Sequence, residues 1–361
     1  AVRNRVPVIS VGRHVHPAIA DQVIRDGKAD MVAFGRALIA EPELINKYAE
    51  NRLDSARVCL GCNEGCTGHT GKLLDITCAI NPRAGYEGKY PLGVKADKAL
   101  KVAVVGAGPA GLQAALTAAQ RGHSVTLFER GEDIGGLLHP ASRPPFKDSL
   151  MELVRYFRHE LDALGVNIRC GVTVTGRMLQ AQAFDMTLLA TGSRPVIPRF
   201  AAELPNMTTA EHILLEAIKP GHRVLIIGGG MIGCELADFL GERGHAVTIL
   251  EMRPEVAQDM EWRARHTLMP RLERYGVTLL TGMEIMETAN TGRIRIRDAY
   301  GVEEWLEPFD TTAISVGYRP EKMLARELEH MRLPYKAIGD CVAPGRILDA
   351  MHQGLAAAYA L

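Results

Sequence analysis

The chain has 361 residues, of which 47% are hydrophobic and 23% charged, and its formal net charge is zero. This length allows two or three hydrophobic cores, and the balanced charge excludes the basic surface of a nucleic-acid-binding protein or of one that binds an anionic membrane. No apolar run is long enough for a membrane-spanning helix. The odd number of cysteines, seven, and the lack of a visible signal peptide predict a cytoplasmic protein with reduced thiols.

The first 58 residues contain two βα units, which we interpret as the C-terminal part of a (β/α)₈ barrel. Apolar runs at 6–11 and 30–34 predict buried strands, and helices are expected over 17–26 and 42–51. Each strand ends in a Gly-Arg pair, and the last two βα loops of such barrels commonly bind phosphate. Two ordinary surface arginines remain the alternative on these residues alone. The two pairs are Gly12 with Arg13 and Gly35 with Arg36.

A cysteine-rich segment follows at 59–84. Two, three and eleven residues separate its four cysteines, which are Cys59, Cys62, Cys66 and Cys78. This spacing is typical of a [4Fe–4S] cluster held by four thiolates. A zinc site would normally pair two CxxC hooks at longer separation, and a disulfide framework fits poorly with an odd cysteine count. The polar stretch 85–99 then predicts a linker.

The rest of the chain contains an internal repeat with a constant offset of 122 residues, since 228 − 106 and 251 − 129 both equal 122. Each copy has a strand, a GxGxxG-type turn, a helix, and a glutamate eighteen residues beyond the third glycine. These are the features of a Rossmann dinucleotide site: the glycines let the pyrophosphate approach the helix N-terminus, and the glutamate binds ribose hydroxyls. The copies carry Gly106, Gly108, Gly111 and Glu129, and Gly228, Gly230, Gly233 and Glu251.

The surroundings of the two copies predict which nucleotide each one binds. A second glycine turn at 135–136, an Ala-Thr-Gly turn at 190–192 and a Gly-Asp pair at 339–340 are typical of an FAD domain, expected over 100–215 and 331–361. The second copy, 216–330, is then an inserted domain for NADH rather than NADPH, because Glu251 would repel a 2′-phosphate. The further FAD contacts are Ala110, Arg130, Gly136, Val174, Ala190, Thr191, Gly192 and Asp340; the further NADH contacts are Met231, Ile232 and Gly317. Three other cysteines are expected to pack in cores: Cys170, Cys234 and Cys341.

The run ISVGRHVHPAIADQVIRDGKADMVAFGRALIAEPEL, followed by CLGCNEGC and CAINP, resembles the old yellow enzyme superfamily. More narrowly, it is similar to its iron–sulfur flavoenzymes of the 2,4-dienoyl-CoA reductase and clostridial enoate reductase type. The resemblance implies FMN at the barrel's two Gly-Arg pairs. A family barrel has eight strands and this chain starts at about the seventh. Residues that hold the flavin ring and protonate the substrate are therefore expected upstream, and the rest of the barrel is needed for activity.

Together these features predict an α/β protein with a barrel end, an iron–sulfur segment and two Rossmann-like domains, the second inserted in the first. The implied electron path runs from NADH through FAD and the cluster to FMN, which reduces an activated C=C bond of an enoate, dienoyl-CoA or enone. An amine dehydrogenase of the trimethylamine dehydrogenase type is one alternative, although its second glycine fingerprint has decayed. An electron-transfer module like the glutamate synthase small subunit is the other, although it carries no barrel remnant. The expected partner is a small-molecule substrate, and a homo-oligomer is compatible with the sequence.

Overall fold

The computed structural model describes residues 6–361. The chain divides into two compact units. The first contains the chain up to Leu138, Ser149–Gly192 and Pro320–Leu361, and the second contains His139–Asp148 and Ser193–Arg319. The inserted domain was expected at 216–330. The main segment of the second unit, Ser193–Arg319, instead begins at β7 (Ser193–Pro195) and ends within β16 (Tyr318–Pro320), and these two short strands pair with each other.

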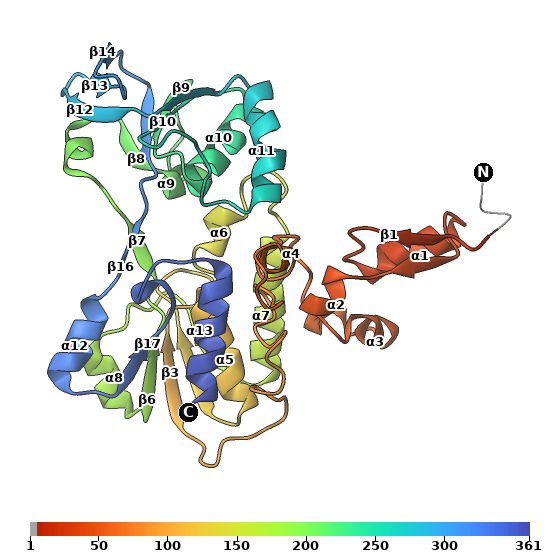
Figure 1. The fold of residues 1–361 in the computed structure, drawn as a ribbon. Coiled ribbons are helices and arrows are strands. Elements are labelled where there is room, and N and C mark those ends of the chain that lie inside the picture. Colours follow the sequence, from red (N-terminus) through yellow and green to blue (C-terminus); the bar gives the residue numbers. More distant parts are fainter. Residues whose placement is uncertain (1–5) are drawn as a thin grey trace. The chain divides into compact units, whose positions relative to one another are not determined.

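The N-terminal part of the first unit is small and irregular (Figure 1). Its two strands, β1 (Ile9–Val11) and β2 (Met31–Ala33), pair in parallel and are shorter than the apolar runs that predicted them. The expected helix over 42–51 is α3 (Leu44–Ala49), and a helix that we did not expect precedes it, α2 (Arg36–Ala40). Glu41 ends α2 with extended backbone, φ −142°, because the proline that follows it disfavours the helical conformation. The remaining helices here are α1 (Pro17–Arg25), η1 (Leu53–Ser55) and α4 (Thr67–Thr70).

The first unit is built around a five-stranded parallel sheet of order β17-β6-β3-β4-β5. The strands are β3 (Lys101–Val105), β4 (Ser124–Phe128), β5 (Asn167–Arg169), β6 (Met186–Leu189) and β17 (Tyr335–Ala337). The alanine-rich helix α5 (Pro109–Gln120) is buried and packs closely on α13 (Ile347–Tyr359): a Cβ on Gly354 would lie 2.4 Å from the Ala110 carbonyl oxygen. The other helices are α6 (Leu138–Ala141), α7 (Leu150–Ala163), α8 (Gly176–Gln182), α12 (Met323–Met331) and η3 (Gly339–Cys341).

The second unit repeats this plan with a parallel sheet of order β11-β10-β9-β15-β8. Its strands are β8 (Met207–Thr209), β9 (Arg223–Ile227), β10 (Ala246–Glu251), β11 (Thr278–Thr281) and β15 (Thr311–Ile314). An antiparallel sheet is formed by β12 (Glu284–Thr288), β13 (Ile294–Arg297) and β14 (Glu303–Leu306). Its Ile294 and Ile296 pack in one buried cluster with apolar side chains of the parallel sheet. The helices are η2 (Arg199–Glu203), α9 (Ala210–Leu214), α10 (Met231–Glu242) and α11 (Trp262–Arg274).

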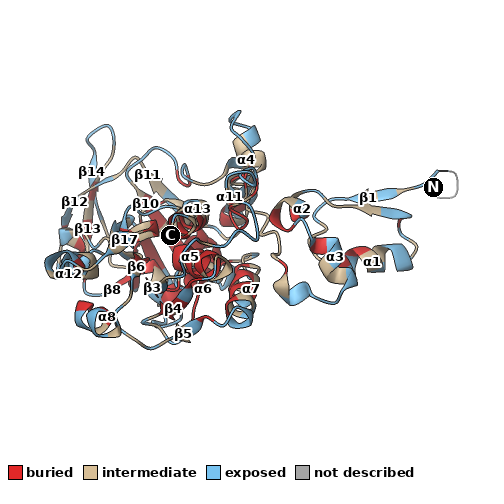
Figure 2. Ribbon diagram, turned by 90° about the horizontal axis from the view of Figure 1, so that it is seen from below, coloured by how far each residue is buried: buried red, intermediate tan, exposed pale blue. Residues whose placement is uncertain are grey.

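Burial differs sharply along the chain (Figure 2). The central strands of both parallel sheets and the helices α5 and α10 are almost wholly buried, which explains their continuous apolar runs. In β1 and β2, by contrast, Ile9, Val11 and Met31 are 55%, 75% and 47% exposed. No helix among the described residues is both long and apolar enough to cross a membrane.

Candidate functional site

Both glycine turns have the backbone that their sequences predict. Gly106 and Gly228 leave β3 and β9 with φ of 104° and 106°, a region that favours glycine. A Cβ on Gly111 would lie 1.9 Å from the Gly106 carbonyl oxygen, and one on Gly233 would lie 2.0 Å from that of Gly228. Each third glycine therefore lets its helix pack directly on the turn before it. At the second glycine of the first copy, Gly108, a Cβ would meet nothing within 4 Å, so open space lies where a pyrophosphate would approach.

Each acidic partner is bound to its own glycine turn. The Glu129 carboxylate accepts hydrogen bonds from the backbone N–H groups of Ala107 and Gly131, both at 2.8 Å. The Glu251 carboxylate accepts the corresponding bonds from Gly229 at 2.6 Å and Arg253 at 2.8 Å. A carboxylate has about four acceptor positions, so each glutamate keeps capacity for ribose hydroxyls. The sequence analysis missed that these glutamates also fix the loops.

The remaining residues expected at FAD gather around the start of α5. The Gly135 N–H donates to the Ala107 carbonyl at 2.8 Å, and a Cβ on Gly136 would lie 3.1 Å from the Gly108 Cα. Gly339 lies close enough that its Cβ would be 2.7 Å from that of Ala110, which brings the neighbouring Asp340 to this end of the sheet. The Ala190-Thr191-Gly192 turn directly follows β6, while Arg130 follows β4.

Other predicted contacts have different surroundings. Val174 packs against a buried cluster that contains Phe128 and Leu179, which is a core position. Cys234 and Cys341 are buried as expected, but Cys170 is only partly buried and follows the short edge strand β5. In the second unit, Met231 and Ile232 form the first turn of α10, and Gly317 lies just before β16 with φ of 108°.

The four cysteines of the 59–84 segment line one common cavity, together with Arg36, Asn63 and Gly65. None of the seven cysteines forms a disulfide. Burial, with smaller contributions from the neighbouring charges of Glu64, Cys78 and Cys66, raises the pKa of Cys62 to about 12. Burial also raises the pKa of Cys78, with Cys59 contributing in the same direction. The thiols are therefore close enough to interact, and a bound metal is what would hold them as thiolates.

A single metal ion and a cluster require different spacings of the four thiols. Among the described residues, no three His, Cys, Asp or Glu side chains converge closely enough to hold one metal ion. A tetrahedral zinc ion with Zn–S bonds of about 2.3 Å would require sulfurs about 4 Å apart. A cubane presents a separate iron to each thiolate, so its ligands stand farther apart around one cavity. The donor set fits a [4Fe–4S] cluster.

The cysteine loop rests on the helix that closes the first nucleotide fold. A Cβ on Gly65 would lie 2.9 Å from the Thr77 backbone and 3.0 Å from Leu348 of α13. At the helix start, Arg346 forms an ion pair of 3.0 Å with Glu64. One turn farther along α13, the Thr77 hydroxyl and His352 Nε2 are 3.1 Å apart. The cysteine cavity and the start of α5 are thus joined through α13, a link that no sequence motif signals.

The two barrel arginines also reach this loop. Arg36 hydrogen-bonds Asn63 and lines the cysteine cavity. A Cβ on Gly61 would lie 3.5 Å from the Arg13 guanidinium. Around Gly12 and Gly35 a Cβ would meet nothing within 4 Å. The space beside these glycines and the charges of Arg13 and Arg36 suit a phosphate group. Both arginines also lie next to the cysteine loop.

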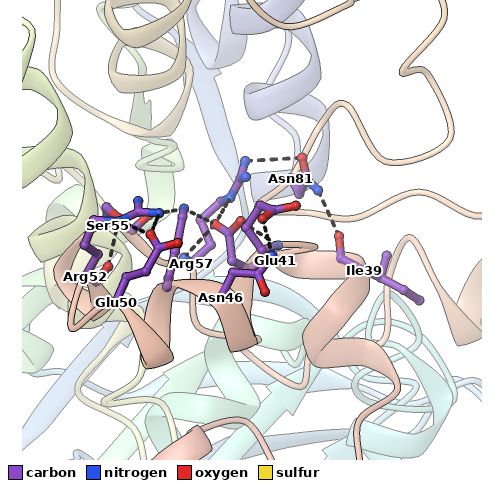
Figure 3. A network of polar contacts seen from close by, with 10 residues as sticks. Ile39, Glu41, Asn46, Glu50, Arg52, Ser55, Arg57 and Asn81 are labelled. Carbon is purple, nitrogen blue, oxygen red and sulfur yellow. Dashed lines mark hydrogen bonds and ion pairs between the residues drawn. The ribbon is translucent and has the colours of Figure 1, made fainter.

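A buried polar network attaches the barrel end to the cysteine segment (Figure 3). Glu41, only 2% exposed, pairs with Lys47 Nζ at 3.0 Å and Arg57 Nε at 3.4 Å. Arg57 donates to Asn81 at 3.2 Å, and its guanidinium lies 5.6 Å from the centre of the Tyr156 ring of α7. Burial acts to raise the pKa of Glu41, but Arg57 and Lys47 outweigh it and the pKa is lowered.

Comparison with known proteins agrees with this anatomy. The model of the pyridine nucleotide-disulphide oxidoreductase family matches residues 100–346. The chain belongs to this family. The model of the NADH:flavin oxidoreductase / NADH oxidase family matches residues 2–55, which is the barrel end.

Several known proteins resemble the chain over almost its whole length. NADH oxidase of Thermoanaerobacter brockii is 37% identical, over 98% of this chain and 55% of that protein. Cinnamate reductase of Clostridium sporogenes is 36% identical, over 96% of this chain and 52% of that protein. A solved structure of 2-naphthoyl-CoA reductase with 2-naphthoyl-CoA matches with a TM-score of 0.94 and 28% identity, over 99% of this chain and 54% of that one.

The chain thus spans about half the length of the relatives that it matches. Within this chain, the barrel end matched at 2–55 precedes the cysteine segment and the two Rossmann-like folds matched at 100–346. FAD, NADH, FMN and an iron–sulfur cluster are the cofactors that these relationships imply. The two glycine turns, the glutamates and the shared cysteine cavity fit the nucleotides and the cluster.

Proposed function

We propose that the chain is the electron-supplying portion of an NADH-dependent flavin oxidoreductase that reduces an activated C=C bond. Electrons would pass from NADH through FAD and a [4Fe–4S] cluster to FMN. The observation that carries this proposal is the contact of α13 with both the cysteine loop and α5. This contact joins the expected cluster site to the expected FAD site within one compact unit.

Each group has its own residues in this proposal. The turn at Gly106–Gly111, with Glu129 and the Gly339-Asp340 pair, holds FAD, and the turn at Gly228–Gly233 with Glu251 holds NADH. The four cysteines bind the cluster. When bound, FAD accepts two electrons together and releases them singly, which is why a flavin suits the junction between a hydride donor and a cluster. The chain's own contribution is to orient the nucleotides and keep the cysteines together.

We further propose that β1 and β2 are the last two strands of an FMN-binding barrel. Parallel strands usually have both faces covered, yet the apolar side chains of Ile9 and Val11 are more than half exposed. Additional barrel strands would cover them and would supply the substrate site and the proton donor. We propose a cytoplasmic enzyme, since the cysteines need a reducing environment. Its substrate is an enoate, a dienoyl thioester or an enone.

An amine dehydrogenase would share the barrel, cluster and domain order. Our preference for a reductase rests on the second fold. There the glycines of 228–233 keep their close contacts, and Glu251 keeps its place at the end of β10. A protein that passes electrons outward has no need of a complete nicotinamide nucleotide site. A module without a barrel, like the small subunit of glutamate synthase, would have no use for the matched segment 2–55.

The test uses the reconstituted chain under anaerobic conditions with NADH as the donor. We expect reduction of an artificial dye but no turnover of cinnamate or an enoyl thioester, because both nucleotide folds are complete and the barrel strands are not. Absence of NADH-dependent dye reduction by FAD-loaded protein would contradict the proposed electron entry. Turnover of cinnamate by this chain alone would show that the substrate site lies within it.

A further inference from the structure

The N-terminus of α10, where the second fold would bind a pyrophosphate, carries a carboxylate of the protein itself. Asp259 Oδ1 accepts a hydrogen bond of 2.8 Å from the backbone N–H of Met231, the first residue of α10. A Cβ on Gly230 would lie 3.5 Å from Asp259 Oδ2. The carboxylate therefore lies over the second glycine of the turn. That is the position at which the dinucleotide fold brings phosphate oxygens to the helix.

The first fold has a leucine in place of this carboxylate. With the repeat offset of 122 residues, Asp259 corresponds to Leu137 and Ala257 to Gly135. The Gly135 and Ala257 N–H groups donate to matching carbonyls, Ala107 at 2.8 Å and Gly229 at 2.7 Å. This hydrogen bond is common to the two loops, but their backbones differ: φ is 124° at Gly135 and 53° at Ala257. The second fold therefore differs from the first both in loop backbone and in carrying a carboxylate at position 259.

The helix residue that Asp259 contacts differs in the same way. The first position of α5 is Pro109, which has no N–H, whereas the first position of α10 is Met231. Only the second fold offers an N–H donor at this position, and only the second fold has an acid to occupy it. The charge acts on the helix start as well. Burial raises the pKa of Cys234 to about 12, and the charge of Asp259 is the largest contribution after burial.

We propose that Asp259 is an internal competitor of the nucleotide pyrophosphate. In the free protein it satisfies the helix N-terminus, and it has to leave when NADH binds, because two negative groups cannot share one N–H donor at close range. The consequence is weaker binding and faster exchange of NADH. That behaviour suits a substrate that leaves after each turnover, and the FAD fold lacks the device. This inference rests on the proposed assignment of the second fold to a nicotinamide nucleotide.

The experiment measures NAD⁺ and ADP-ribose binding to the oxidised FAD- and cluster-loaded protein by calorimetry. Neither ligand can reduce the flavin, so the readout is independent of turnover. Asp259→Asn keeps the shape of the side chain but removes its charge. We expect both ligands to bind about three- to tenfold more tightly than to the unmodified protein, the range of one net hydrogen bond and one helix-terminus charge. Glu255→Gln, which removes an exposed charge from the same loop, is the matched control and should leave affinity unchanged.

A double-mutant cycle locates the effect at the helix. Met231→Pro copies the first fold and removes the shared N–H donor, and proline is tolerated at the first helical position. In that background, Asp259→Asn should give less than half of its former gain. Equal or weaker binding of both ligands to Asp259→Asn would overturn the inference while leaving the proposed function intact. Failure of the unmodified protein to bind either ligand would instead contradict the proposed function.

Discussion

The two nucleotide folds share a backbone plan but differ in what surrounds the helix after the glycine turn. In the first fold, the C-terminal helix α13 returns to pack on α5, and Gly339 meets Ala110 at the helix start. In the second fold, α10 is covered by α9 and α11 of its own unit, and Asp259 occupies its N-terminus. The first arrangement suits a cofactor that stays bound, and the second suits a nucleotide that exchanges.

The same comparison separates the paths that electrons take in the proposal. Only the first fold places residues of its closing helix, Arg346 and His352, on the cysteine loop. Entry of electrons and their transfer to the cluster would therefore depend on different folds. Substitutions in one should leave the function of the other measurable.

The largest effect should come from removing a cluster ligand. Cys78→Ala should abolish the cluster, because three thiolates cannot complete a four-thiolate site. Flavin and its reduction by NADH should persist, since both glycine turns are untouched. Iron and sulfide analysis with EPR checks the first point, and anaerobic flavin spectra check the second. Cys170→Ser is the control, because Cys170 does not line the cysteine cavity. Full iron content in Cys78→Ala would mean that Cys78 is not a ligand.

The ion network around Glu41 (Figure 3) should contribute to the stability of the first unit. Glu41→Gln should lower the free energy of unfolding by about 3 kcal/mol, because it leaves the partly buried Lys47 and Arg57 without their buried counter-charge. The folded pKa of Glu41 is lowered. Its contribution is thus present above the unfolded pKa and is lost as pH falls through the folded pKa.

Denaturant unfolding at several pH values tests this prediction. The difference between Glu41→Gln and the unmodified protein should be full near neutral pH and should shrink in acid. The exposed neighbour Glu43→Gln is the matched control and should change stability little. A difference that stays constant down to acid pH would show that the carboxylate charge of Glu41 does not stabilise the fold.

The same substitution at the third glycine of each turn should affect a different nucleotide in each fold. Gly111→Ala and Gly233→Ala each place a Cβ about 2 Å from a carbonyl oxygen, which forces the helix away from its turn. We expect Gly111→Ala to weaken FAD binding about ten- to a hundredfold. Gly233→Ala should keep FAD and lose NADH affinity by a similar factor. Flavin retention on gel filtration measures FAD binding, and calorimetry measures NADH binding. Loss of FAD in both variants would contradict the assignment of FAD to the first fold and NADH to the second.

The choice between NADH and NADPH should depend on Glu251. A 2′-phosphate would meet its carboxylate and lose the ribose hydrogen bonds, at about 1.5–3 kcal/mol, so NADH should be favoured at least about tenfold in kcat/KM. Glu251→Ser should reduce that preference. Because Glu251 also accepts hydrogen bonds from Gly229 and Arg253, the variant should lose some activity with both nucleotides. An unchanged NADH to NADPH ratio would show that Glu251 does not contact the ribose.

The sequence predicted most of what depends on local chemistry. The helix α5 (Pro109–Gln120) follows the glycine turn as the repeat predicts, because the turn before it and a Gly-His pair after it fix both ends. The four cysteines share a cavity as their spacing indicates. The helix α2 was missed, since five residues ended by a proline-directed break give almost no periodic signal.

Long-range contacts could not be predicted from the sequence. The pairing of Thr77 with His352 joins residues 275 positions apart, and the ion pair of Arg346 with Glu64 joins residues 282 positions apart. No motif indicates that these residues meet. Asp259 could have been suspected from the repeat, where a charged residue replaces Leu137, but only the structure shows which N–H it binds.

The most direct test of the electron path is an anaerobic titration of the FAD- and cluster-loaded chain with NADH, followed by EPR. The account predicts that NADH alone bleaches the flavin and produces the signal of a reduced [4Fe–4S] cluster, with both changes lost in Gly233→Ala. If dithionite produces the cluster signal but NADH bleaches the flavin without producing it, then electrons do not pass from the FAD fold to the cysteine segment. That result would contradict the central claim.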